Sequence, residues 1–158
     1  MSTGIVWYAD VVNDDVMWDG FADAVVRLDL PTGCVVLEPR PPGDLGTFPF
    51  EAPVHIVTAY NPAGIEIDEE TNISRHRSLR FALNRRNVFP TVGSAPDGSM
   101  PEPGFGVLDM SLGDALQLAT DFGQLAIYQW TRDALSIVDV DGNHRCRQGW
   151  SLSGHRPG

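Results

Sequence analysis

The sequence predicts an α+β protein: a single-layer, mostly antiparallel or mixed β-sheet with about three helices packed on it. Apolar residues recur at helical spacing in three segments and as short β-branched runs elsewhere. Clusters of Gly, Pro, Asn and Asp separate these segments, and the helices come singly between pairs of strands. The chain has 158 residues, 42% hydrophobic and 20% charged, so we expect a single folded domain.

Residues 1–50 are expected to form an N-terminal extension that packs on the core. A helix over residues 16–28 is predicted by five apolar residues at helical spacing: Met17, Phe21, Ala24, Val25 and Leu28. Residues 34–37 predict a short strand. The proline-rich segment that follows predicts a connecting loop, with Phe48 and Phe50 against the core.

Residues 51–141 are expected to form the core. The apolar run at 53–60 predicts a buried strand, and Asp68 is placed to cap a long helix that ends near Asn87. Acidic residues at the start of this helix and arginines near its end suit the helix dipole. Residues 88–92 and 105–110 predict strands on either side of a turn-rich loop.

The remainder predicts a second long helix and a hairpin. Ser111 and Asp114 make a capping box, and Gly123 ends the helix that follows. Strands are expected at 124–131 and 134–140, joined by a turn at 131–133. Residues 142–158 are expected to be a polar, frayed tail.

The charge of the chain is unevenly distributed. The net charge is −10, and all eleven cationic side chains are Arg. Residues 71–90 contain five Arg and no acid, so this segment carries +5 and the rest carries −15. Guanidinium groups bind phosphate bidentately, so the basic helix predicts a site for an anionic group, or else a solvated face paired with acids. The overall negative charge makes sequence-specific DNA binding unfavourable.

Several classes of protein are disfavoured by missing signals. The start of the chain has no signal-peptide pattern, and no apolar run is long enough to cross a membrane, so we expect a soluble, cytoplasmic protein. Cys34 and Cys146 lack metal-ligand spacing and are expected to be reduced, with a disulfide as the alternative. We expect no metal site and no cofactor, because no ligand spacing, phosphate loop or dinucleotide motif is present.

Four motifs together resemble a known family. They are VTAYNPAG at 57–64, the Arg-bearing helix that begins ETN at 70, GSAPDGS with EPGFGV between 93 and 107, and FGQLAIY at 122–128. The combination is similar to DUF3293, a family of small bacterial proteins of unknown function, over about residues 53–140. The resemblance implies no activity. It implies only that the strand end Tyr60-Asn61-Pro62, Asn72, the Pro-Asp-Gly-Ser loop at 96–99, Glu102 and Gln124 belong to a shared pattern.

Eight residues are candidates for a ligand-binding site: Tyr60, Asn61, Asn72, Arg75, His76, Asp97, Glu102 and Gln124. The polar residues that end the 53–60 strand can form a binding rim or simply begin a turn. Arg75 is the helix arginine expected to face inward. Glu102 lies between two prolines, so it can serve as a rigid acid–base group or as a bridge to an arginine. No catalytic residue is assigned.

Three functions remain open from these residues. The first is a binding module that holds a small anionic or nucleotide-like ligand in a polar groove. The second is an acidic interaction protein, of the inhibitor or immunity type, that binds a basic protein partner. The third is a hydrolase or transferase acting on a phosphate ester or glycosidic bond, with His76 or Glu102 as the base and Arg75 stabilising charge.

Overall fold

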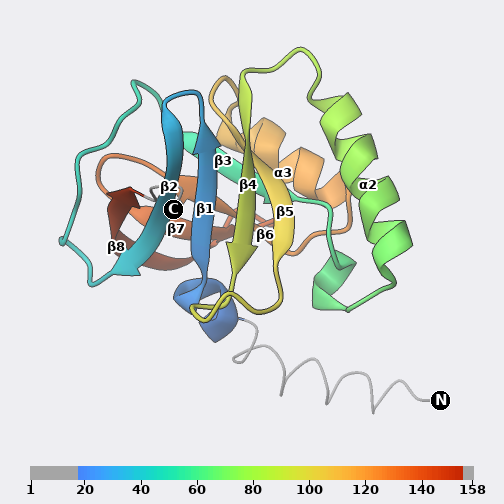
Figure 1. The fold of residues 1–158 in the computed structure, drawn as a ribbon, viewed down its shortest axis with the longest axis horizontal. Helices are drawn as coiled ribbons and strands as arrows, with labels where there is room; N and C mark the ends of the chain where they lie inside the picture. The colour runs from blue at the N-terminus through green and yellow to red at the C-terminus, as the bar shows by residue number, and fades with distance from the viewer. Residues whose placement is uncertain (1–17, 155–158) are drawn as a thin grey trace.

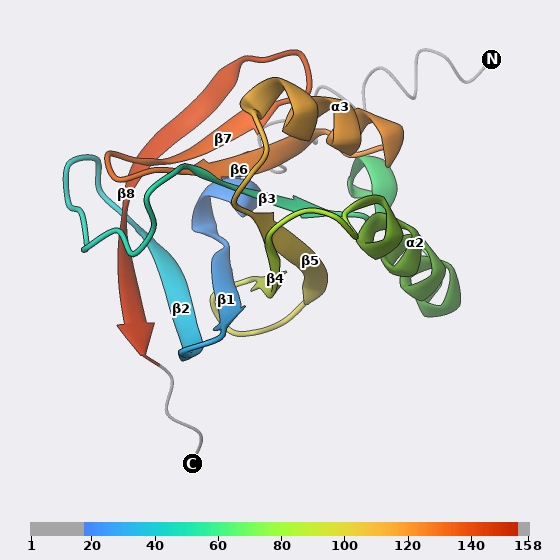
Figure 2. The ribbon, with the colours of Figure 1, turned by 90° about the horizontal axis from the view of Figure 1, so that it is seen from above.

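The computed structural model of the chain describes residues 18–154 and shows a closed, antiparallel β-barrel (Figures 1 and 2). The eight strands follow the order β1-β2-β8-β7-β6-β3-β5-β4 around the barrel. The predicted single-layer sheet is therefore wrong: the sheet closes on itself, and the helices lie outside it. The strands are β1 (Val25–Leu30), β2 (Gly33–Arg40), β3 (Val54–Thr58), β4 (Val88–Ser94), β5 (Glu102–Val107), β6 (Ala126–Trp130), β7 (Leu135–Asp139) and β8 (His144–Gly154).

Two pairings between distant segments close the barrel. β1 pairs with β4, with Val25 opposite Ser94, and β2 pairs with β8, with Leu37 opposite Leu152. The other neighbours are hairpins or pairs within the predicted core. Because every strand has two partners, the sheet has no free edge.

Two helices cover one side of the barrel, next to β3 and β5 (Figure 2). Helix α2 (Glu69–Ala82) begins at Asp68, whose carboxylate accepts a hydrogen bond from the backbone N–H of Thr71. Helix α3 (Leu112–Asp121) begins at Ser111, whose hydroxyl oxygen accepts one from the N–H of Asp114. Both predicted N-caps are confirmed.

The alternating side chains of the strands form two separate cores. One core lies between the helices and the outer face of the barrel, where Leu79 of α2 and Ala119 of α3 meet Val57 and Phe105. The other fills the barrel interior. In β3, Val54 and Ile56 belong to the interior core and Val57 to the outer core, as the two-residue period of a strand requires.

Aromatic side chains fill one end of the barrel interior. Trp130 and Trp150 are fully buried and pack edge to face at 5.2 Å between ring centroids. Phe48 and Phe50, from the loop before β3, pack against Trp130 at 5.1 and 5.7 Å. The expected packing of these two phenylalanines on the core is confirmed.

A helical segment at residues 18–23 closes the other end (Figure 1). The Tyr128 hydroxyl donates to the Phe21 carbonyl at 2.8 Å, and Gln148 Nε2 donates to the Ala22 carbonyl at 2.9 Å. Both donors lie on barrel strands, so they satisfy carbonyls at the end of this helical segment.

Two expectations about the ends of the chain need correction. The predicted helix at 16–28 is helical only at 18–23 within the described residues, because Val26 and Leu28 point inward from strand β1. Residues 144–154 of the expected polar tail form β8. Cys34 and Cys146 are free thiols at opposite ends of the β2–β8 pair, so they do not meet.

Candidate functional site

Three of the predicted site residues form a hydrogen-bonded cluster where β3 leads toward α2. Asn61 Nδ2 donates to Glu102 Oε2 at 3.0 Å, and Asn61 Oδ1 accepts from Asn72 Nδ2 at 2.8 Å. Asn72 Oδ1 in turn accepts from the backbone N–H of Asn61 at 2.9 Å. Asn61 has a φ of 46°, a left-handed conformation that Asn tolerates better than most residues. The cluster therefore ties the end of β3 to α2 and to the start of β5.

Glu102 lies half-buried at the start of β5. Burial raises the pKa of its carboxyl above the usual range, and the hydrogen bond from Asn61 opposes that rise. The expected bridge from Glu102 to an arginine is not what the structure shows, because the salt bridges of residues 18–154 do not include Glu102. Its observed partner is the Asn61 amide.

Arg75 faces inward, as predicted, but its guanidinium is engaged. Arg75 Nε donates to the Ala59 carbonyl at 2.8 Å, and Nη2 donates to the Phe122 carbonyl. The side chain thus joins the end of β3 to the end of α3. A guanidinium held by two backbone carbonyls is poorly placed to take a phosphate group.

Tyr60 and Gln124 are linked at the same junction. Gln124 Nε2 donates to the Tyr60 carbonyl at 3.1 Å, and the Tyr60 hydroxyl donates to Glu69 Oε2 at 3.3 Å. Tyr60 is 6% exposed, and burial raises the pKa of its hydroxyl. Its polar atoms therefore hold the start of α2 against the barrel.

His76 packs among rings. Its imidazole stacks on Phe105 with 4.8 Å between centroids and meets the Tyr60 ring edge to face at 6.1 Å. Burial lowers its pKa, and the nearby Arg80 lowers it further. The ring contacts of His76 are with Phe105 and Tyr60, whereas Glu102 bonds to the Asn61 amide. His76 and Glu102, the two candidate bases of the hydrolase or transferase hypothesis, therefore have different partners.

Asp97 lies apart from the cluster. Its carboxylate accepts hydrogen bonds from the N–H and hydroxyl of Ser99, at 2.9 and 2.6 Å, within the exposed 95–101 loop. These bonds lower the pKa of the Asp97 carboxyl. The Asp97 side chain therefore stabilises the turn in which it lies.

The glycines of the EPGFGV motif have a packing role. A Cβ on Gly106 would overlap the Phe89 ring in the barrel interior, and a Cβ on Gly104 would overlap the Val57 carbonyl. β5 therefore lies too close to its neighbours for any side chain at these positions.

The exposed face of α2 carries a feature that the sequence analysis missed. Phe81 is 76% exposed, with Arg77 one helical turn before it and Arg85 four residues after it. Within residues 18–154, Arg77, Arg80 and Arg85 make no salt bridge, whereas Arg86 reaches Asp114. The alternative interpretation of the basic helix, in which its arginines pair with acidic side chains, therefore does not hold for Arg77, Arg80 and Arg85. Leu79 and Phe81 are two residues apart, so helical spacing places their side chains on opposite sides of α2. This spacing is the feature of the sequence that indicates an exposed Phe81.

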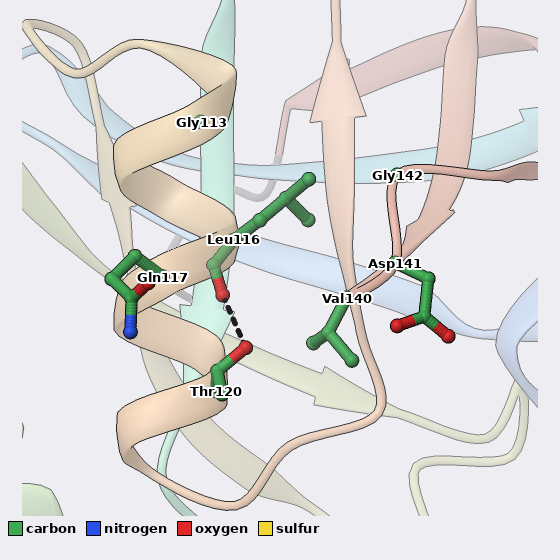
Figure 3. A pocket seen from close by; sticks show the side chains of 7 residues that line it. All are labelled: Gly113, Leu116, Gln117, Thr120, Val140, Asp141 and Gly142. Carbon is green, nitrogen blue, oxygen red and sulfur yellow. Dashed lines mark hydrogen bonds between the residues drawn. The ribbon is translucent and has the colours of Figure 1, made fainter.

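Two surface hollows lie elsewhere. One, of about 250 Å³, lies between α3 and the turn between β7 and β8, and its lining includes Leu116 and Val140 (Figure 3). The Thr120 hydroxyl beside it donates to the Leu116 carbonyl at 2.9 Å. The other, of about 450 Å³, lies between β2, β8 and residues 22–23. Neither is lined by a predicted site residue.

Two further findings concern the part of the chain that the structure describes. There, no group of three or more His, Cys, Asp or Glu side chains is arranged to hold a metal ion. No helix in that part has the length and apolar character needed to cross a membrane.

Residues 57–127 match the model of a family described as proteins of unknown function, DUF3293. This is the family that the four motifs resemble, so the resemblance is confirmed over that stretch. No curated protein and no solved structure matches the chain. The matched stretch contains all eight predicted site residues, α2, α3 and the Phe81 face.

Proposed function

We propose that the protein is a cytoplasmic binding module for a small anionic, nucleotide-like ligand, and that the exposed face of α2 holds this ligand. The observation that carries the proposal is the set of three exposed arginines without a carboxylate partner in the described residues: Arg77, Arg80 and Arg85. In a chain with net charge −10, carboxylates are abundant, yet none between residues 18 and 154 forms a salt bridge with these side chains. Unpaired guanidinium forks close together along α2 and the turn that follows it suit phosphate groups.

The hydrogen-bonded cluster around Asn61 supports this site from beneath. Arg75 and Gln124 bond to backbone carbonyls, and Asn72 bonds to Asn61, so their polar atoms fix α2 on the barrel. A rigidly held helix presents its outward arginines in a defined arrangement, which reduces the entropy lost when a ligand binds.

A thermal-shift screen tests the proposal. The panel contains nucleotides, sugar phosphates and inorganic tripolyphosphate. A ligand at 100 times its dissociation constant adds about 2.7 kcal/mol, which raises the Tm of a chain this size by about 5 to 11 °C. We expect Arg77→Gln and Arg80→Gln to reduce the shift. Arg132→Gln, which removes an exposed charge from the β6–β7 turn, is the matched control.

Two results would contradict the proposal. The first is that no phosphate compound of the panel raises the Tm of the wild-type protein. The second is a shift of equal size in the Arg77→Gln, Arg80→Gln and Arg132→Gln proteins, because it would place the ligand away from α2.

A second candidate function is the binding of a basic protein partner at the opposite end of α2. Glu66, Asp68, Glu69 and Glu70 are exposed there, next to Ile65, which is 64% exposed. Asp68 and Glu69 have structural partners, so Glu66 and Glu70 are the acids to change. We expect the Glu66→Gln, Glu70→Gln double variant to bind an arginine-rich peptide more weakly at low salt. Equal binding by both proteins would exclude this surface.

A further inference from the structure

We propose that the α2 face binds a segment of single-stranded nucleic acid, with one unpaired base stacked on Phe81 and the flanking phosphates held by Arg77 and Arg85. This inference rests on the proposed anion binding by the same face and names the polymer that supplies the anions.

Phe81 lies on the outward side of α2. Its neighbours Leu79 and Leu83 are each 1% exposed, whereas Phe81 is 76% exposed on the opposite side of the helix. Arg77 precedes it by one helical turn, and Arg85 follows it by four residues, in the turn that ends α2. Four helical residues span about 6 Å along the axis, so Arg77 lies one turn before Phe81 on α2, and Arg85 follows in the turn after Ala82.

The exposed ring and its neighbouring arginines favour a ligand that carries both flat rings and negative charges. The apolar part of the face is small, because the only other large exposed apolar residue on α2 is Ile73, which is 39% exposed and two turns away. A hydrophobic protein interface uses a wider patch. An acidic peptide complements the arginines but offers no ring for Phe81. Nucleic acid supplies both alternating anions and flat rings, and bases stack on aromatic side chains regardless of sequence.

An exposed aromatic ring favours single strands over duplexes. Duplex bases are paired and stacked on each other, so they present only their edges. Stacking on Phe81 requires a free face, which single strands provide. The negative charge of the rest of the chain opposes a long contact, so the contact is short. Binding of two or three phosphates to single-stranded DNA gives a slope of log K against log salt of about −1.4 to −2.1.

The test compares three probes by fluorescence anisotropy or competition: a short oligothymidylate, inorganic tripolyphosphate and oligoglutamate. The proteins are wild type, Phe81→Leu, Arg77→Gln and the Arg132→Gln control. Phe81→Leu keeps an apolar side chain on the helix but removes the ring. We expect it to weaken oligothymidylate binding about tenfold or more and to leave tripolyphosphate binding unchanged. Arg77→Gln should weaken both.

The outcomes separate the two proposals. In one outcome, Arg77→Gln weakens tripolyphosphate binding but Phe81→Leu leaves oligothymidylate binding unchanged. That outcome refutes the stacking of a base on Phe81 and leaves the proposed anion binding standing. Oligoglutamate binding as tight as oligothymidylate binding also refutes stacking. If no probe binds wild type, both proposals fail. Circular dichroism and urea unfolding of each variant show whether a loss of binding comes from loss of the fold.

Discussion

Replacing Asn72 with Ala tests whether the cluster around Asn61 holds the fold together. Asn72 is 3% exposed and makes two hydrogen bonds to Asn61, at 2.9 and 2.8 Å. The substitution leaves the part-buried Asn61 N–H without a side-chain partner and removes a second bond. An unpaired buried donor costs about 1–3 kcal/mol and a lost bond about 1, so we expect a loss of about 2–4 kcal/mol. The Tm should fall by about 4 to 16 °C.

Urea unfolding followed by tryptophan fluorescence measures this loss, because Trp130 and Trp150 are fully buried. Asn84→Ala, at an exposed position after α2, is the control and should change the unfolding free energy by less than about 0.5 kcal/mol. A double-mutant cycle of Asn72→Ala with Asn61→Gly isolates the contact between the side chains. Glycine suits the left-handed backbone at position 61.

We expect a coupling free energy of about 0.5–3 kcal/mol from that cycle. A cost below about 0.5 kcal/mol for Asn72→Ala, together with additive effects in the cycle, would refute the structural role of the cluster. The Asn61, Asn72 and Glu102 side chains would then be available for ligand binding, as the sequence first suggested.

Three further predictions concern single positions. Gly106→Ala forces a methyl group against the Phe89 ring inside the barrel and should lower the free energy of unfolding in urea by about 1–3 kcal/mol or more. Gly113→Ala is the control: open space surrounds this position, so the free energy of unfolding should stay the same or rise by up to about 1 kcal/mol. Arg75→Ala breaks two part-buried bonds to backbone carbonyls and should cost about 2 kcal/mol. The exposed Arg77→Ala should cost less than about 0.5 kcal/mol, and equal costs would contradict the assigned contacts. Burial raises the pKa of the Glu102 carboxyl in the folded state above its ordinary value of 4.5. The free energy of unfolding of the wild type should therefore fall as the pH rises from 4.5 through the folded-state pKa. Glu102→Gln should remove that part of the decline when unfolding is measured across this pH range.

The local structure was largely predictable from the sequence. Both long helices begin at the residues whose side chains suggested N-caps, Asp68 and Ser111, because capping depends on neighbours three residues away. The hairpin between β6 and β7 also forms where turn residues separate two apolar runs. These features depend on short-range contacts, which a sequence pattern contains.

Barrel closure was not predictable from the same patterns. β1 pairs with β4 and β2 with β8 across long stretches of chain, and no local pattern specifies such partners. The run that contains Val26 and Leu28 fits both helical and strand periods, so the helix prediction extended too far. In β8 the inward residues include Cys146 and Gln148 as well as Trp150, so the strand resembles a polar tail.

The site was predicted in part. The inward orientation of Arg75 follows from helical spacing, but its two carbonyl partners come from separate elements that meet only in the folded chain. Asp97 was grouped with the site because its loop has turn chemistry, and the structure assigns that chemistry to the turn itself. Phe81 was overlooked because the sequence interpretation of this helix rested on its arginines, although helical spacing places Phe81 on the side opposite Leu79.

The order of strands around the barrel has a consequence for synthesis on the ribosome. Strands β4, β5, β3 and β6 are neighbours, but β2 finds its second partner only in β8, at residues 144–154. A nascent chain that has emerged only as far as β7 therefore carries unpaired edges on β2 and β7. Such edges invite pairing with other chains. Stalled or truncated products should thus aggregate or be degraded, and release of the last strand should be the event that commits the chain to its native state.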